Sequence, residues 1–269
     1  MSGAIHGFDH VVIAVRDLAP AVSAYETLLG RKSFAQEERE GVATASIALD
    51  NIAVELMAPV GDTEAVRRLD AALEIGEGLK SLVFATNDIE RLHRRCERVG
   101  LEPEQIKLKT DRRSFRADTE RAHGVRLFFM QREIPLAPSP YADASILGLD
   151  HVVIQSAEME RAAALYGARL GLDMRLDRDL RGRRLMFFRC GDAIVEIAHV
   201  KEREHDLLWG LSWRVANAEA ARARLAGAGI DVSEVRSGMK PGTRVFTVRD
   251  STCNVPTLMI EAVRAEQPA

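Results

Sequence analysis

The hydrophobic and polar positions follow one order that recurs along the chain. A short strand-like run is followed by a polar residue suited to helix capping, a helix-period run, a glycine and further strand-like runs. The capping residues are Asp17, Asp88 and Asn217. The pattern predicts four modules, each with one strand, one helix and about three further strands. The modules lie near residues 5–60, 78–132, 148–200 and 206–263.

A letter-for-letter repeat pairs these modules. The segment Asp9–Ile13 (DHVVI) returns unchanged as Asp150–Ile154, 141 residues later, and the same offset carries Val54-Glu55 onto Val195-Glu196 without a gap. Such a register predicts a tandem duplication. We expect a first domain at 5–132 and a second at 148–263, joined by a proline-rich linker at 133–147.

Composition is consistent with a soluble globular chain. The 269 residues are 46% hydrophobic and 29% charged, with a net charge of −3, which favours neither nucleic acid nor membrane as a partner. Three cysteines without CxxC spacing argue against disulfides and a thiolate zinc site. The start, MSGAIHGFDHVV, lacks the build of a signal peptide, and no apolar run is long enough to span a membrane. We therefore expect a cytoplasmic protein with a small-molecule partner.

Strand alternation places the repeated polar residues on one side of each sheet. In the first strand the large apolar residues share one face, so His10 falls on the other. In the last strand of that module, Glu55 lies opposite an apolar face. His10 and Glu55 are therefore predicted on the open side of one curved sheet, and His151 and Glu196 on the open side of another.

The sequence resembles the vicinal oxygen chelate superfamily, which includes glyoxalases, bleomycin-resistance proteins and extradiol dioxygenases. The segments DHVVIAVRDLAPAVSAYETLLG and DHVVIQSAEMERAAALYGARLGL are similar to its first strand and helix. The segments VELMAP and VEIAH are similar to its ligand-bearing last strand. The resemblance covers nearly all of the chain. It implies an α+β fold of four βαβββ modules, in which each pair of modules forms a cup-shaped mixed sheet with outer helices.

The resemblance also implies a divalent metal inside the cup. Carried over by position, the metal ligands are His10, Glu55, His151 and Glu196, and the two glutamates are the catalytic proton carriers. His and Glu ligands suit Zn, Fe, Ni, Co or Mn. The even-numbered modules depart from the pattern. Module two has Ser81 with Leu127 or Phe128 at these positions, and module four has Gly210 with Thr257.

This departure leaves several readings open. Extradiol dioxygenases of this build draw their iron ligands from modules three and four, so that activity is disfavoured. A complete set of two His and two Glu arises only if modules one and three meet, within the chain or in a homodimer. The sequence therefore predicts a metal-dependent lyase or isomerase, less favourably a dioxygenase, acting on a small vicinal-oxygen or carbonyl substrate. The alternative is a metal-free binding or sequestration protein of the bleomycin-resistance type.

Other residues are candidates for supporting roles. His199, His123 and His205 are possible additional ligands, and His93 with Cys96 is a helical pair expected on an outer helix. The basic segment KLKTDRRSFR at 107–116 is predicted as a loop, either solvated or clamping a carboxylate or phosphate. Six aromatic residues fit either a cup wall or the core. They are Phe128, Phe129, Phe187, Phe188, Trp209 and Trp213.

Overall fold

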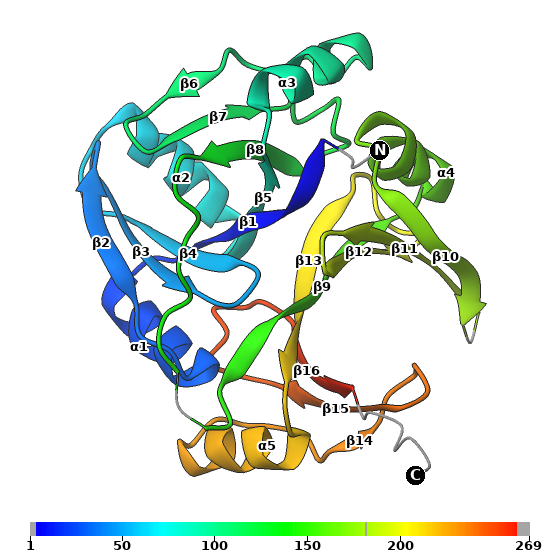
Figure 1. The fold of residues 1–269 in the computed structure, drawn as a ribbon. Helices are drawn as coiled ribbons and strands as arrows, with labels where there is room; N and C mark the ends of the chain where they lie inside the picture. The colour runs from blue at the N-terminus through cyan, green and yellow to red at the C-terminus, as the bar shows by residue number, and fades with distance from the viewer. Residues whose placement is uncertain (1–3, 142, 181, 263–269) are drawn as a thin grey trace.

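The chain folds into two curled mixed sheets of eight strands each. The computed structural model describes residues 4–141, 143–180 and 182–262. One sheet has the order β2-β3-β4-β1-β5-β8-β7-β6, and the other repeats it as β10-β11-β12-β9-β13-β16-β15-β14 (Figure 1). The expected α+β class and two-domain layout are confirmed.

The first sheet and its helices come from the first half of the chain. Its elements are β1 (Ile5–Ala14), α1 (Leu18–Leu29), β2 (Phe34–Arg39), β3 (Val42–Ala48), β4 (Ala53–Pro59), α2 (Glu64–Glu74), β5 (Gly78–Thr86), α3 (Ile89–Arg98), β6 (Lys107–Leu108), β7 (Arg112–Arg116) and β8 (Arg126–Arg132). Modules one and two therefore share one sheet.

The second half repeats this arrangement. Its elements are β9 (Ile146–Ser156), α4 (Met159–Ala163), the π-helix η1 (Ala164–Arg169), β10 (Asp173–Leu180), β11 (Arg183–Cys190), β12 (Ala193–His199), β13 (Leu207–Val215), α5 (Ala218–Gly227), β14 (Arg236–Ser237), β15 (Thr243–Val248) and β16 (Thr257–Ala262). Modules three and four pair with each other, so modules one and three do not share a cup within this chain.

The helices begin where the polar caps predict. Asp17 accepts a hydrogen bond from the Ala19 amide at the start of α1, and Asp88 accepts one from the Arg91 amide at the start of α3. Asn217 plays the same part in α5. These side chains satisfy amides that have no partner inside the helix. The apolar faces of the helices then pack against the outer faces of the sheets in one extended core.

Helix α2 was not expected from the sequence, and it lies on the inner face of the first sheet. Its residues Val66, Leu69 and Leu73 form an apolar cluster with Ala14 of β1 and the partly buried Met57 of β4. Strand alternation puts Ala14 and Met57 on the same face as His10 and Glu55. Between β12 and β13 of the second domain, the connecting residues 200–206 form no helix. The inner face of the first cup is therefore partly covered, and that of the second is not covered in this way.

The domains exchange equivalent contacts where they meet. Arg224 of α5 donates to the carbonyls of Thr27 and Leu28 at the end of α1. Arg95 of α3 donates to the carbonyls of Ala168 and Arg169 at the end of η1, each at 2.8 Å. A cation at a helix C-terminus complements the helix dipole. Each domain therefore caps a helix of the other.

Two further findings bear on the sequence-based expectations. All three cysteines are free. In the described ranges, no helix is both long and apolar enough to cross a membrane.

Candidate active site

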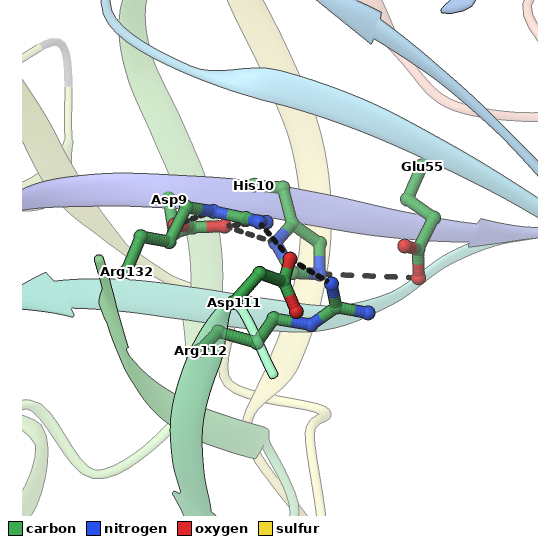
Figure 2. A network of polar contacts seen from close by, with 6 residues as sticks. All are labelled: Asp9, His10, Glu55, Asp111, Arg112 and Arg132. Atoms are coloured by element: carbon green, nitrogen blue, oxygen red, sulfur yellow. Dashed lines mark hydrogen bonds and ion pairs between the residues drawn. The ribbon is translucent and has the colours of Figure 1, made fainter. Parts of the chain in front are cut away.

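The inner face of each sheet brings one histidine and one glutamate together. In the first domain β1 and β4 run parallel with His10 beside Ala53 and Val12 beside Glu55. The Nε2 atom of His10 lies 3.9 Å from Oε1 of Glu55 (Figure 2). In the second domain the corresponding distance, from His151 Nε2 to Glu196 Oε2, is 3.4 Å.

An aspartate fixes the orientation of each imidazole. His10 Nδ1 lies 2.6 Å from Asp9 Oδ1, and His151 Nδ1 lies 2.8 Å from Asp150 Oδ2. A carboxylate can only accept a hydrogen bond, so Nδ1 is the donor in each contact. The other ring nitrogen, Nε2, faces the glutamate oxygen, which accepts while the carboxylate is ionised. A cation or a proton between the two atoms stabilises this arrangement.

Asp9 is itself held by an ion pair. Arg132 of β8 donates to both carboxylate oxygens, at 2.7 Å and 2.9 Å (Figure 2). Burial alone raises the pKa of Asp9, but the hydrogen bonds from His10 and Arg132 outweigh burial and lower the pKa to about 2. In the second domain the pKa of Asp150 is also lowered. Burial raises this pKa, but the hydrogen bond from His151 and the nearby Arg214 lower it by more. Both aspartates therefore stay ionised while they orient the histidines.

The lowered pKa of Asp9 predicts a specific acid sensitivity. Its contribution to folding is fully present above the ordinary pKa of 3.8 and is lost as the pH falls through about 2. Asp9→Asn should lower the free energy of unfolding by about 2 kcal/mol at neutral pH. Urea denaturation should show this difference shrinking between pH 4 and pH 2. The exposed Asp70→Asn is the matched control, and an equal, pH-independent loss in both variants would refute the assignment.

Glu196 differs from Asp9 in its surroundings. Burial raises the pKa of Glu196, and the attraction of His151 offsets burial only in part. The side chain is 15% exposed, against 26% for Glu55. A carboxylate with a raised pKa exchanges a proton more readily near neutral pH. Glu196 is therefore suited to carry a proton to and from a bound molecule.

The even-numbered modules add no His or Glu to either pair. The strand register places Ser81 opposite Val12 and Phe128 beside Val83, which resolves the choice between Leu127 and Phe128. In module four Ser212, opposite His151, pairs with Leu258. The expectation of Thr257 is therefore wrong by one residue, because the parallel register turns Leu258 to the inner face and buries Thr257.

Each cup brings together one histidine and one glutamate as candidate metal ligands. Among the described residues, no group of three or more His, Cys, Asp or Glu side chains is arranged to hold a metal ion. Two donors that each lie about 2.0–2.2 Å from one ion at a tetrahedral angle are about 3.4 Å apart. The separation of His151 and Glu196 matches this value. The pair therefore fits a divalent cation that takes its other ligands from water and substrate.

The other candidate histidines lie away from these pairs. His199 is three residues after Glu196 on β12, so alternation points it to the opposite face. His123 Nδ1 lies 3.7 Å from Asp206 Oδ2, next to His205 where the domains meet. His93 lies on the outer helix α3, with its Nε2 2.9 Å from the Glu104 carbonyl oxygen.

The linings of the two cups differ in chemistry. On the inner face of the second sheet, Val153, Leu185 and Ala198 pack with Phe187 around the position of Glu196. Of the six aromatic residues, Phe129, Phe188 and Trp213 are fully buried in the core, whereas Trp209 is exposed. The second cup therefore offers an apolar wall beside its polar pair.

The first cup is lined by arginines instead. The segment 107–116, expected to be a loop, contains β6 and β7, which pair antiparallel. Alternation turns Arg112 and Arg116 inward and Arg113 outward, where Arg113 pairs with Glu90 of α3. Figure 2 shows the Arg112 guanidinium on the same side of the sheet as His10 and Glu55. Sequence reasoning did not single out Arg126, which lies beside Ser81 at the start of β8. It also missed α2, although Thr63 and the spacing of Val66, Leu69 and Leu73 signal a capped helix.

Comparison with known proteins agrees with this architecture. Residues 8–138 match a family profile described as a glyoxalase-like domain. Residues 148–254 match the profile of the glyoxalase/bleomycin resistance protein/dioxygenase superfamily. No curated protein gives a significant match.

Several solved structures share the fold at low sequence identity. The Mn(II)-bound glyoxalase from Novosphingobium aromaticivorans has 14% identity and a TM-score of 0.72, covering 98% of this chain and 84% of its own. A mutant 4-hydroxymandelate synthase from Streptomyces coelicolor has 12% identity and a TM-score of 0.75, with coverages of 97% and 94%. The halotolerant catechol dioxygenase BphC has 12% identity and a TM-score of 0.70, with coverages of 97% and 88%. At these identities, the likeness concerns the fold alone.

Proposed function

Because the chain belongs to the glyoxalase/bleomycin resistance protein/dioxygenase superfamily, with two such domains in tandem, we propose that it is an enzyme acting on a small oxygen-bearing molecule. The proposal places the reaction in the cup of the second domain. One observation carries it: His151 Nε2 lies 3.4 Å from Glu196 Oε2 on the inner face of the second sheet. These two donors would hold a divalent cation, which supplies Lewis acidity to a substrate oxygen.

The chain's own residues favour a proton-transfer reaction. Asp150 keeps His151 oriented through its 2.8 Å contact with Nδ1. Burial raises the pKa of Glu196, which suits that carboxylate to remove a proton from a substrate carbon and return it. Such a transfer underlies isomerase and lyase chemistry. A dioxygenase of the facial-triad type needs two histidines and a carboxylate, and the described residues supply no such trio.

The lining of the second cup indicates the kind of substrate. The side chains of Val153, Leu185 and Phe187 form an apolar wall on the same face as Glu196. An apolar wall with a few converging polar groups is typical of small-molecule sites. We therefore expect a substrate with a compact carbon skeleton and adjacent oxygen atoms, one end against the wall and the other at His151 and Glu196.

A second candidate function is metal-free binding of a small molecule. The small number of donors in each cup supports it, because catalytic zinc sites usually have three protein ligands. In that case His151 and Glu196 would share a proton and would hydrogen-bond directly to the ligand. The two candidates differ in what a metal does to the protein.

Metal content separates them. After purification without chelator, incubation with excess Mn²⁺ and desalting, elemental analysis should find close to one Mn²⁺ per chain. Loading should also raise the melting temperature, because a ligand that binds only the native state stabilises it. Mn²⁺-containing buffer without protein, desalted in parallel, gives the background. Loss of all Mn²⁺ on desalting, without a shift in melting temperature before desalting, would favour metal-free binding.

A further inference from the structure

A cluster of basic side chains lies on the inner face of the first domain, apart from the site in the second. We propose that Arg126, Arg116 and Lys80 form a site for the phosphate group of a small ligand. The site is independent of the proposed reaction, because it lies in the other cup.

The strand register brings Arg126 and Arg116 to one face, and Lys80 is the extra residue of a β-bulge beside Ser81, where its Nζ atom donates to the Gly76 carbonyl oxygen at 2.6 Å. Arg126 is the first residue of β8 and pairs with Ser81 of β5, which lies opposite Val12 of β1. Val12 in turn pairs with Glu55. Side chains in register on neighbouring strands point to the same face, so Arg126 shares the inner face with Glu55. Arg116 of β7 pairs with Phe128, two residues along β8, and points the same way.

Arg126 has no ion-pair partner among the described residues, and its Nε atom makes no hydrogen bond there. The residue is partly buried, and its Nε atom is fully buried. The Nε atom of Arg116 is also buried and unbonded, although its Nη2 lies 2.5 Å from Glu104 Oε1. A buried charged group without a counter-charge is costly, so such groups are usually paired. An anion bound between the two guanidinium groups would supply both partners.

The charges around Arg126 are mostly of its own sign. Burial lowers the pKa of Arg126, and the nearby Arg116 and Arg68 lower it further, with Glu104 opposing them. Burial and then Arg126 lower the pKa of Lys80. Glu104 is already shared by Arg116 and Lys107. The positive excess favours a doubly charged group such as phosphate over a single carboxylate, and guanidinium groups match phosphate geometry well.

The duplication provides an internal comparison. In the second domain the position that corresponds to Arg126 is Pro256, next to Thr257 in the β13–β16 register. The position that corresponds to Arg116 is Thr247, which pairs with Leu258. The second cup therefore has a neutral wall where the first has arginines. The basic cluster is a property of the first domain and does not follow from the fold.

Calorimetric titration with inorganic phosphate at fixed ionic strength tests the site. Wild type should bind phosphate, and Arg126→Gln should weaken binding at least about tenfold, the loss expected for a charged hydrogen bond. Arg94→Gln, which removes the same charge from the exposed side of α3, should bind like wild type. Acetate should bind more weakly than phosphate. Tighter binding of acetate, or equal phosphate binding by Arg126→Gln and wild type, would overturn the proposal.

A structural role for Arg126 gives a different result. If the guanidinium only supported the fold, Arg126→Gln would lower the melting temperature in phosphate-free buffer. We expect it unchanged or raised, since the substitution relieves repulsion from Arg116 and Arg68. Arg116→Gln provides a second variant and should weaken phosphate binding as well. Mn²⁺ binding should be unaffected by either change, which keeps this test separate from that of the second cup.

Discussion

Replacing Arg31 with alanine should destabilise the chain by about 2–4 kcal/mol, because its buried guanidinium is a hydrogen-bond donor to several backbone carbonyls. The Arg31 side chain is fully buried just after α1. It donates at 3.0 Å to the carbonyls of Ser139, Ile146 and Leu147, and at 2.8 Å to Asp50. Alanine would leave the Ser139 and Ile146 carbonyls without this donor, at about 1–3 kcal/mol for each one that stays buried, whereas the Leu147 carbonyl keeps the Asp50 amide as a donor at 3.0 Å.

The contacts of Arg31 join the first domain to the start of the second. Ser139 belongs to the connection between the domains, and Ile146 is the first residue of β9. The side chain therefore ties the end of α1 to the start of the second sheet. Urea denaturation measures the change, with Lys32→Ala as the matched control because Lys32 is 84% exposed. A loss below about 1 kcal/mol for Arg31→Ala would show that the contacts contribute little to stability.

Periodicity and the internal repeat predicted much of the fold. The alternation around His10 and Glu55 identified the inner face, because a strand with one buried face leaves little choice of register. The caps Asp17, Asp88 and Asn217 marked three helix starts, since each side chain bonds a free helix amide. These signals are local, and local signals can be read from the sequence.

The features that the sequence did not predict depend on how strands distant in the sequence pair with each other. Leu258 rather than Thr257 faces inward because the register between β13 and β16 pairs Ser212 with Leu258. The sequence of module four does not specify this register to within one residue. Arg112–Arg116 formed a strand although it is highly charged, because β8 offers an edge for pairing. The cluster of Arg126 with Lys80 involves residues from different strands, so no sequence window contains it.

The second large effect concerns the proposed metal site. Glu196→Gln should weaken Mn²⁺ binding by about 100-fold or more, because an amide oxygen replaces the only charged donor of a two-donor set. The fold should persist, because the substitution keeps the shape of the side chain and removes a carboxylate whose pKa is raised by burial. The repeat supplies the matched control. Glu55→Gln makes the same change in the first cup, where the His–Glu separation is 3.9 Å and α2 partly covers the inner face.

Mn²⁺ titration of wild type, Glu196→Gln and Glu55→Gln, at the same pH and ionic strength, tests directly whether the second cup is the working site. We expect one saturable Mn²⁺ site per chain in wild type, its loss in Glu196→Gln and its retention within about threefold in Glu55→Gln. Each variant must show a wild-type circular dichroism spectrum. Undiminished Mn²⁺ binding by Glu196→Gln, or its loss in Glu55→Gln alone, would contradict the assignment of the site to His151 and Glu196.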